Sequence, residues 1–541
     1  MNQTIWFKYF IRPWYHELHN LVDWPGGLLD CFEDFILFFP LLLSLSWSIS
    51  ALVKLVLYVF RRSNSVNLNE TTLPSFSVLI PFYGDGSQAV RSLESLREVT
   101  PRPQAIFLID DGSPVGGGLP KEFLMPSEVT LLRLPQNKGK AAALNAALHL
   151  IESEIVVCLD ADTTALTKSW SPMLAQFTRN QTLGAITGKI RPRQMKNLVQ
   201  WMQAIDYLAV ICMVKCSESL WGGLTTVSGA WVAYRRQALV ETGGWNSKAG
   251  AEDIDLSWKL QSSGWRLDYD FNWTANVEMA RRWSSLWKQR RRWSCGMAQT
   301  LRKQALGIFR PGARHGMISL LTVLGCLWVV SSFGMVFVTL IKLLKGQIAL
   351  FHGSEGLLTL GGGAFILQLL VGILIDRGSR QRYPLMILLA FIYPIYFWCI
   401  LFTSNIAGLY QGFFRRDNGK WHPTSVLEVT KNIRVPKIIN SVSILNEINY
   451  EFASTETVNS VQQAIPMAKR AQAFIIQMLR IVMLGWSLLC FYSAVNIVLK
   501  GNHSAVLYSV GLIQFLIGAM SWFVACLRMP ASSRFEKTQP I

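Results

Sequence analysis

The chain has 541 residues, 51% of them hydrophobic, with 20 Trp and a formal net charge of +18. A helix needs about 20 apolar residues to cross a bilayer, and several apolar runs reach this length. We therefore exclude a protein that lies entirely in water. Nine scattered Cys, without a CxxC pair or a Cys/His spacing typical of zinc, exclude a disulfide scaffold and a zinc module.

The surplus of Lys and Arg has two uses that fit a membrane chain. Basic residues flank membrane spans on the cytoplasmic side. They also attract anionic lipid or a phosphate-bearing substrate. No nucleic-acid-binding motif accompanies them, so no nucleic-acid partner is expected.

Residues 1–62 read as an N-terminal segment followed by a first transmembrane helix. Residues 1–34 are rich in aromatic and acidic residues, and this argues against a cleavable signal peptide. The first spanning candidate is 35–60, with Lys54 able to extend toward the membrane surface. Arg61 and Arg62 follow at once, so the next segment is expected to be cytoplasmic.

Residues 63–310 read as a water-exposed α/β domain. Short apolar runs that end in small or acidic residues are typical of strands buried on both faces. These runs alternate with helical patterns, which predicts a mostly parallel sheet. The expected strands are 75–83, 105–113, 129–135 and 154–162, and the expected helices are 88–97 and 140–150. Ligands of such sheets lie outside the carboxyl ends of the strands.

Acidic residues follow two of these strands. Asp110 and Asp111 begin a DDGS segment, which fits either a plain turn or the recognition of a nucleoside. Asp160 and Asp162 follow another strand with one residue between them. Mg²⁺ is commonly held by one or two carboxylates together with substrate phosphate oxygens, so this pair indicates a metal–diphosphate site.

Two glycine-containing segments lie one before and one after the pair Asp160 and Asp162. NKGKAAALN (137–145) fits either a basic helix start or a helix N-terminus that binds phosphate, and it lacks the P-loop spacing. VSGAWVAYRR (227–236) fits either the lining of a sugar pocket or a core strand. The stretch 201–213 is more typical of a core or interfacial helix than of a site.

The segment from 249 to 293 carries the most chemistry. Glu252, Asp253 and Asp255 start a helical pattern, and they fit either a proton-accepting cluster or first-turn acids. The sequence KQRRRW (288–293) fits either an anion-binding cluster with an aromatic plate or a basic membrane flank.

The rest of the chain is expected to be mainly membrane-embedded. Residues 311–410 hold the spanning candidates 317–341, 357–375 and 384–410, and Pro394 marks the last of these as re-entrant or partly interfacial. Residues 411–470 read as a polar linker, and 471–541 as a two-helix membrane hairpin.

The order of these motifs resembles processive, membrane-embedded family-2 glycosyltransferases, the group of cellulose, chitin and hyaluronan synthases. The resemblance covers about 75–310 and is carried by PFY, DDGS, NKGKAAALN, DAD, SGA, AEDIDLSWKL and QRRRW. The segments GKIRPRQ, TVSGAWVAYRRQAL and LWKQRRRW resemble bacterial poly-N-acetylglucosamine synthases in particular. The fold implied is a GT-A domain embedded in α-helical transmembrane segments.

The resemblance also implies a role for each motif residue. Asp253 is the implied catalytic base and Asp162 the implied ligand of Mg²⁺ or Mn²⁺. The residues implied to bind substrate are Tyr83, Asp111, Lys140, Asp160, Glu252, Gln289, Arg292 and Trp293. Tyr83 and Asp111 would hold the uridine, Gln289 and Arg292 would face the diphosphate, and Trp293 would stack under the acceptor sugar.

The implied activity is inverting polymerisation of N-acetylglucosamine from UDP-GlcNAc into β-1,6-linked exopolysaccharide, with export across the bacterial inner membrane. The implied partners are the UDP-sugar donor, the growing polysaccharide, membrane lipid, a small membrane subunit and outer-membrane export proteins. The two C-terminal spans resemble that small subunit, which gives the hypothesis of a fusion. The alternatives are another β-glycan, or a catalytically silent receptor of the same fold.

Overall fold

The computed structural model describes residues 26–63, 72–220, 222–304, 320–334, 355–376 and 383–414. The chain divides into two compact units. The first comprises Met1–Ser46, Leu324–Phe365 and Met483–Ile541, and the second Trp47–Val323 and Ile366–Val482. The expected linker beyond residue 414 and the expected hairpin at 471–541 lie outside the described residues.

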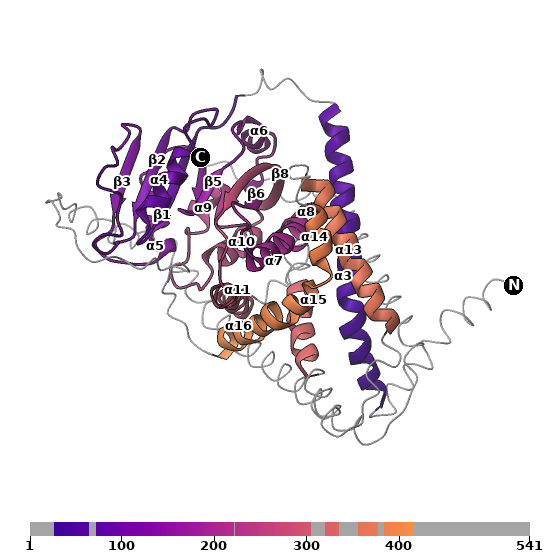
Figure 1. Cartoon of the computed structure of the whole chain (residues 1–541). Helices are drawn as coiled ribbons and strands as arrows, with labels where there is room; N and C mark the ends of the chain where they lie inside the picture. Colours follow the sequence, from indigo (N-terminus) through magenta and orange to yellow (C-terminus); the bar gives the residue numbers. More distant parts are fainter. Residues whose placement is uncertain are drawn as a thin grey trace, which may run out of the picture. The chain divides into compact units, whose positions relative to one another are not determined.

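An eight-stranded sheet forms the centre of the second unit (Figure 1). Its strands are β1 (Phe76–Phe82), β2 (Ala105–Asp110), β3 (Val129–Arg133), β4 (Ile155–Leu159), β5 (Thr163–Ala165), β6 (Leu183–Pro192), β7 (Trp231–Arg235) and β8 (Arg266–Val277). Their order is β3-β2-β1-β4-β7-β6-β8-β5. The predicted strands correspond to β1 to β4, and residues 231–235 of the SGA segment form a core strand.

The sheet is mixed rather than uniformly parallel. β3, β2, β1 and β4 run parallel to one another, as the alternating pattern predicts. β7 is antiparallel to both β4 and β6, and β5 is antiparallel to β8, whereas β6 and β8 are parallel. The four parallel strands therefore form one half of the sheet and the remaining strands the other.

Helices cover both faces of the sheet. They are α4 (Gly86–Glu94), α5 (Lys140–Leu148), α6 (Ser171–Arg179), α7 (Leu198–Asp206), the π-helix η3 (Tyr207–Cys212), α8 (Met213–Leu220), α9 (Arg236–Glu241), α10 (Glu252–Ser262) and α11 (Trp283–Gln304). The predicted helices correspond to α4 and α5. Alternate residues of β1 explain the two faces, because Leu79 belongs to one buried cluster and Val78 and Ile80 to another.

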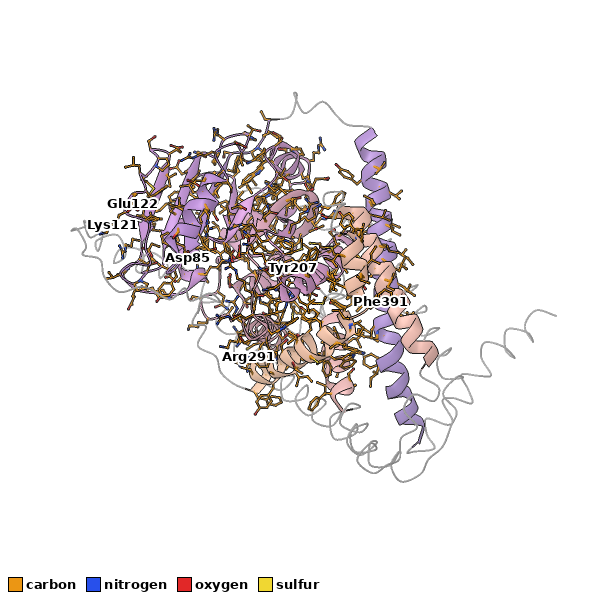
Figure 2. All side chains as sticks on the ribbon, in the orientation of Figure 1. Asp85, Lys121, Glu122, Tyr207, Arg291 and Phe391 are labelled. Atoms are coloured by element: carbon orange, nitrogen blue, oxygen red, sulfur yellow. The ribbon has the colours of Figure 1, made fainter. Side chains whose placement is uncertain are left out.

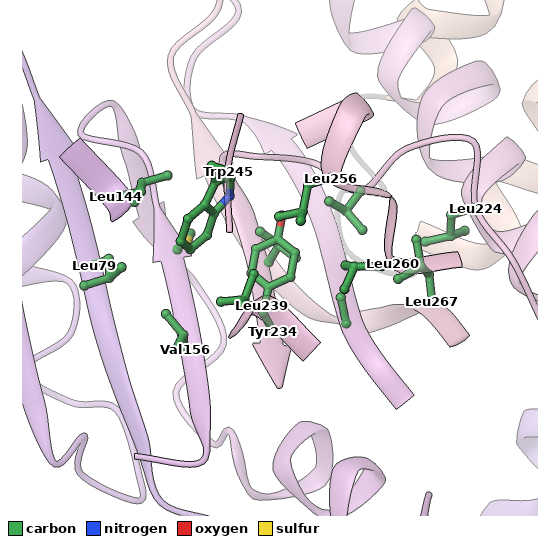
Figure 3. Close-up of a cluster of buried hydrophobic side chains, with 14 of the residues drawn as sticks. Leu79, Leu144, Val156, Leu224, Tyr234, Leu239, Trp245, Leu256, Leu260 and Leu267 are labelled. Atoms are coloured by element: carbon green, nitrogen blue, oxygen red, sulfur yellow. The ribbon is translucent and has the colours of Figure 1, made fainter. Parts of the chain in front are cut away.

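Aromatic side chains fill both clusters. In the first, the rings of Tyr234 and Trp245 meet edge to face at 5.7 Å (Figure 3). In the second, Trp231 and Trp273 stack with centroids 4.1 Å apart, and Trp170 meets both rings edge-on. All three Trp side chains are essentially fully buried, so this aromatic group is a large part of the hydrophobic core.

Apolar helices outside the sheet are α3 (Gly26–Ser63), α13 (Glu355–Asp376), α14 (Tyr383–Ala390), α15 (Tyr393–Tyr396), the π-helix η6 (Phe397–Phe402) and α16 (Thr403–Phe414). Among the described residues, two helices are long and apolar enough to cross a membrane, or three if a bent pair counts as one span. The first is Phe39–Val59, within the predicted span 35–60, and only 11% of its apolar window is buried. The second, Leu198–Leu220, is 67% buried, so it packs as a helix of the domain.

The predicted span 384–410 is bent. Tyr383–Ala390 and Tyr393–Phe414 meet at an angle of 67° beside Pro394, as a re-entrant or interfacial segment would. In the first unit, the Trp328 indole donates a hydrogen bond of 2.8 Å to the Ile36 carbonyl.

Within the second unit, polar contacts join the C-terminal parts of α3 and α13 to β6 and β8. Lys54 of α3 pairs with Asp268 at 2.6 Å, so its ammonium contacts protein rather than only the membrane surface. Asp376, at the end of α13, pairs with Arg191 at 2.6 Å and with Lys189 at 3.2 Å. The non-parallel half of the sheet therefore holds these helices.

Two glycines allow α16 to pack directly on α11, and the two helices lie side by side in Figure 1. A Cβ atom at Gly408 would lie 2.5 Å from the Arg291 carbonyl oxygen. One at Gly412, a helical turn later, would lie 2.5 Å from the Cys295 carbonyl oxygen. Small residues four apart permit this kind of close helix approach.

Candidate functional site

The site lies where neighbouring strands of the parallel half end. β2, β1 and β4 are adjacent and parallel, so the segments after them lie at one edge of the sheet. Tyr83 follows β1, Asp111 follows β2, and Asp160 and Asp162 follow β4. The structure thus places the sequence-predicted acids at the carboxyl edge, where ligands of such sheets bind.

Asp111 organises the start of α5. Its carboxylate accepts hydrogen bonds from the backbone N–H groups of Lys138 (2.9 Å) and Gly139 (2.8 Å). Gly139 has φ 90°, a conformation that favours glycine at this turn. Burial raises the pKa of Asp111, and these two hydrogen bonds offset part of the rise. The two N–H groups are therefore committed to Asp111, which fixes the position of the next residue, Lys140.

Lys140 is the cation at the centre of the site. Its Nζ lies 2.5 Å from Oδ1 of Asp160 and 3.2 Å from Oε1 of Glu252, and it donates to the Gly229 carbonyl at 3.2 Å. These partners come from the segment after β4, from the first turn of α10 and from the SGA segment. One ammonium therefore joins three elements that are far apart in the sequence.

The pKa values of this cluster follow from burial and from mutual charge. Burial alone would lower the pKa of Lys140, but the charges of Asp160 and Glu252 outweigh it and raise that pKa. Burial opposes ionisation of Glu252 as well, yet Lys140 holds the Glu252 pKa below its usual range. Burial raises the pKa of Asp160 despite Lys140. Lys140 and Glu252 are therefore a stable ion pair, and Asp160 is the carboxylate more easily protonated.

Asp253 stands beside this pair at the start of α10. Its Oδ2 accepts a hydrogen bond of 3.1 Å from the Gly229 N–H, and its Oδ1 accepts one of 2.9 Å from the Ile254 N–H. Burial and the neighbouring charge of Glu252 raise its pKa. A carboxylate held in a fixed orientation with a raised pKa has the properties of a general base.

Asp162 is the carboxylate best suited to a metal ion. Asp160 directs Oδ1 at Lys140, whereas the Asp162 carboxylate accepts, from the part of the chain that the structure describes, a 3.2 Å hydrogen bond from the Thr163 hydroxyl. Burial and the charge of Asp160 raise the pKa of Asp162 to about 7, so a cation there would relieve unfavourable charge. Among the described residues no group of three or more His, Cys, Asp or Glu forms a ready-made metal site. This donor set fits an ion completed by substrate phosphate oxygens.

The QRRRW segment lies on α11. Burial, which raises the pKa of both Asp160 and Glu252, and Lys140, which lowers these pKa values, have the larger effects, and the positive charge of Arg292 lowers both pKa values as well. The Arg292 guanidinium therefore lies near the cluster. Trp293 packs against the buried cluster that contains Trp231. The Oε1 atom of Gln289 is buried and accepts no hydrogen bond from the described residues.

The structure therefore brings five of the ten predicted residues together. Lys140, Asp160 and Glu252 are in direct contact, Asp253 contacts the same glycine as Lys140, and Arg292 acts on the cluster through its charge. Tyr83 is half-buried directly after β1.

Sequence reasoning missed two buried groups around the site. Lys215 of α8 donates to the Ser228 hydroxyl at 2.5 Å, next to the glycine that holds Asp253. Asp206 of α7 pairs with Arg290 of α11 at 2.6 Å. For the second pair the sequence did contain an indication, because Asp206 is a charged residue inside the apolar stretch 201–213. Charged residues are rarely buried without a partner.

The sheet and its edge define a GT-A glycosyltransferase domain, in a chain that also carries apolar helices. The family model for Glycosyl transferase family 2 matches residues 77–243. This range contains the strand-end acids and Lys140 and ends before Asp253.

Two curated relatives have the same name. Poly-beta-1,6-N-acetyl-D-glucosamine synthase of Staphylococcus epidermidis is 27% identical over 71% of this chain and 96% of its own length. The protein of that name from Staphylococcus aureus is 28% identical over 50% of this chain and 66% of its own length. A solved mannosyltransferase from Pyrobaculum calidifontis, in complex with GDP-Man and Mn²⁺, has a TM-score of 0.40 and 18% identity, over 70% of this chain and all of its own. The chain is a glycosyltransferase, and the resemblance to poly-N-acetylglucosamine synthases is confirmed.

Proposed function

We propose that this glycosyltransferase polymerises N-acetylglucosamine from UDP-GlcNAc into a β-1,6-linked exopolysaccharide at the inner face of the bacterial cell membrane and helps to export it. The observation that carries the proposal is the joining of Lys140, Asp160 and Glu252 beside Asp253. The similarity to a synthase over 96% of that relative's length supports the product class.

Asp253 is the proposed general base. The acceptor hydroxyl attacks the anomeric carbon of the donor, a new C–O bond forms, and the bond to the diphosphate breaks. The hydroxyl proton passes to the Asp253 carboxylate, which the Gly229 N–H keeps in a fixed orientation. One displacement inverts the anomeric centre, so an α-linked donor gives a β-linked product.

The departing diphosphate meets positive charge from the chain. Arg292 would bind its oxygens, since a planar guanidinium can donate two parallel hydrogen bonds to phosphate. Gln289 would face the same group. Asp162, with Asp160 beside it, would hold a Mg²⁺ or Mn²⁺ ion, which when bound neutralises diphosphate charge. Lys140 keeps Asp160 in place through the 2.5 Å contact.

The remaining predicted residues recognise the two substrates. Tyr83 and Asp111 would hold the uridine, and Trp293 would stack under the acceptor sugar, because aromatic faces pack well on the CH surfaces of a sugar ring. The growing polysaccharide and membrane lipid are the further partners proposed, together with a small membrane subunit and outer-membrane export proteins.

Membranes containing the full chain test the proposal. They receive labelled UDP-GlcNAc, UDP-glucose or UDP-glucuronate, each with Mg²⁺, with Mn²⁺ or with a chelator. Polymer should form from UDP-GlcNAc with metal and be degraded by a β-1,6-specific N-acetylglucosaminidase. Incorporation of another sugar would assign a different β-glycan, and incorporation of none would favour a silent receptor. Asp253→Asn membranes are the matched inactive control.

A further inference from the structure

Arg290 lies inside the QRRRW segment, and the proposed reaction assigns it no role. Its side chain is buried, with 6% exposure, and Nη2 lies 2.6 Å from Oδ2 of Asp206, which is 4% exposed. Its Cζ lies 4.2 Å from the centroid of the Trp293 ring. Its Nε is buried and has no acceptor among the described residues. The Asp206 carboxylate and the Trp293 indole face are two contacts that orient this guanidinium.

The same carboxylate is also held from the other side. The Tyr393 hydroxyl donates a hydrogen bond of 3.1 Å to Oδ1 of Asp206. Tyr393 is the first residue of α15, directly after the 67° bend in the apolar helix pair. Asp206 thus links α7, α11 and α15. A buried ion pair is tolerable when further hydrogen bonds satisfy its atoms, as they do at Asp206.

The ring of Tyr207 is a second aromatic contact of the Arg290 guanidinium. Its centroid lies 5.7 Å from Cζ of Arg290, and Figure 2 labels Tyr207 among the packed side chains, with Arg291 on the neighbouring α11. A guanidinium over an indole face attracts the ring electrostatically and restricts its rotation. A ring restricted in this way presents one fixed face to whatever packs against it.

We propose that Arg290 is a positioning residue that fixes the Trp293 ring for the acceptor sugar, with Asp206 and Tyr393 holding Arg290 in place. The inference depends on the proposed function, because it needs an acceptor sugar on Trp293. Through Tyr393, the same three side chains tie the acceptor platform to the bend of the apolar helix pair.

The decisive variant is Arg290→Lys. Lysine keeps the charge opposite Asp206 but lacks the planar group that lies over the ring. In membranes containing the full chain, acceptor oligosaccharide and UDP-GlcNAc are varied separately. We expect the acceptor KM to rise about fivefold to tenfold, from the lost ring contact. We expect the donor KM to stay within about twofold, because donor contacts lie on other residues.

Arg291→Lys is the matched control. Its Cζ lies 5.2 Å from the centroid of Trp287, a different ring that no proposed role uses. The same substitution one position later should leave both KM values unchanged. Tyr393→Phe is a second, milder variant that keeps the ring and removes the hydroxyl that donates to Asp206, and its acceptor KM should rise by about twofold to threefold.

The outcomes separate the inference from the proposed function. If wild-type membranes elongate no acceptor, the proposed function fails. If they do, and the acceptor KM of Arg290→Lys matches that of wild type, the positioning role is wrong. Parallel rises in both KM values would show a general structural role and also overturn it. If Arg290→Lys does not accumulate, Tyr393→Phe decides by the same criteria.

Discussion

The two halves of the sheet are built differently. The parallel half, β3-β2-β1-β4, carries an acid after each of two strands and receives Lys140 from α5. The other half, β7-β6-β8-β5, contains antiparallel pairs and the stacked rings of Trp231 and Trp273, and it holds the apolar helices through Lys54 and Asp376. The charged cluster lies at the edge of one half, and the stacked rings and the contacts with the apolar helices lie in the other. The residues that complete the site lie on α10, between β7 and β8 in the chain, and on α11, after β8.

Removing the proposed base should have the largest effect, because it should lower activity while leaving the fold nearly intact. Asp253→Asn should lower kcat by about 10²–10⁴-fold, the usual contribution of a general base. Its stability should fall by no more than about 1 kcal/mol, since the asparagine oxygen can still accept from the Gly229 N–H while the bond from the Ile254 N–H is lost. Initial rates of polymer formation and a thermal melt of the solubilised protein measure both. Asp270→Asn, the same change on β8, is the control that should keep the rate.

The charge cluster should respond to Lys140→Met by losing stability as well as activity. Asp160 and Glu252 would then face each other without a counter-charge, at a cost of about 3 kcal/mol, the lower end for a buried pair because the Asp160 side chain is 31% exposed. The loss should be smaller at pH 5 than at pH 8, because protonation of the acids relieves it. Denaturant or thermal unfolding measures it.

Lys168→Met supplies the comparison. Its ion pair with Glu98, at 3.0 Å, has side chains that are 46% and 74% exposed, so the loss should stay below about 1 kcal/mol. Equal losses for the two variants would mean that Lys140 is no more than a surface cation.

A substitution in the half that contains antiparallel pairs should lower stability and leave donor binding unchanged. Trp273→Ala removes a fully buried ring stacked on Trp231 and should cost about 3 kcal/mol or more of unfolding free energy. The fraction that remains folded should keep the wild-type KM for UDP-GlcNAc, because no donor contact is assigned to this ring. A donor KM that changes in proportion to stability would contradict the division between the two halves.

The smallest expected effect concerns pH and metal. The pKa of Asp162 is raised to about 7, above its value in the unfolded chain. Without metal, the folded state should therefore lose stability as pH rises toward about 7, and metal should restore it. Apparent Mn²⁺ affinity should fall by about tenfold for each pH unit below 7 and be constant above it. Titration with Mn²⁺ measures this, and Asp162→Asn should abolish the pH dependence.

The parallel half was predictable from the sequence because its strands are continuous apolar runs bounded by acids. The antiparallel placement of β7 was not, because residues 231–235 read equally as strand or pocket lining, and pairing partners are set by tertiary packing. The motif residues Lys140, Asp160, Glu252 and Asp253 were predicted, but their pairing was not, because it depends on tertiary contacts, such as the one between Lys140 and Gly229, 89 residues apart. The Asp206–Arg290 pair joins residues 84 apart, and no spacing rule indicates such a pair.

The contact between α11 and α16 restricts which sequences this chain can tolerate. At Gly408 and Gly412 the backbone of α16 contacts the backbone of α11, so even an added methyl group would force the two helices apart. We therefore expect every substitution at these two positions to impair the protein. Phe391 and Ile395, exposed by 71% and 67%, should accept almost any apolar residue. A library with every substitution at these four positions, scored for polymer secretion, would measure this contrast. We expect no active variants at the two glycines and many active variants at Phe391 and Ile395.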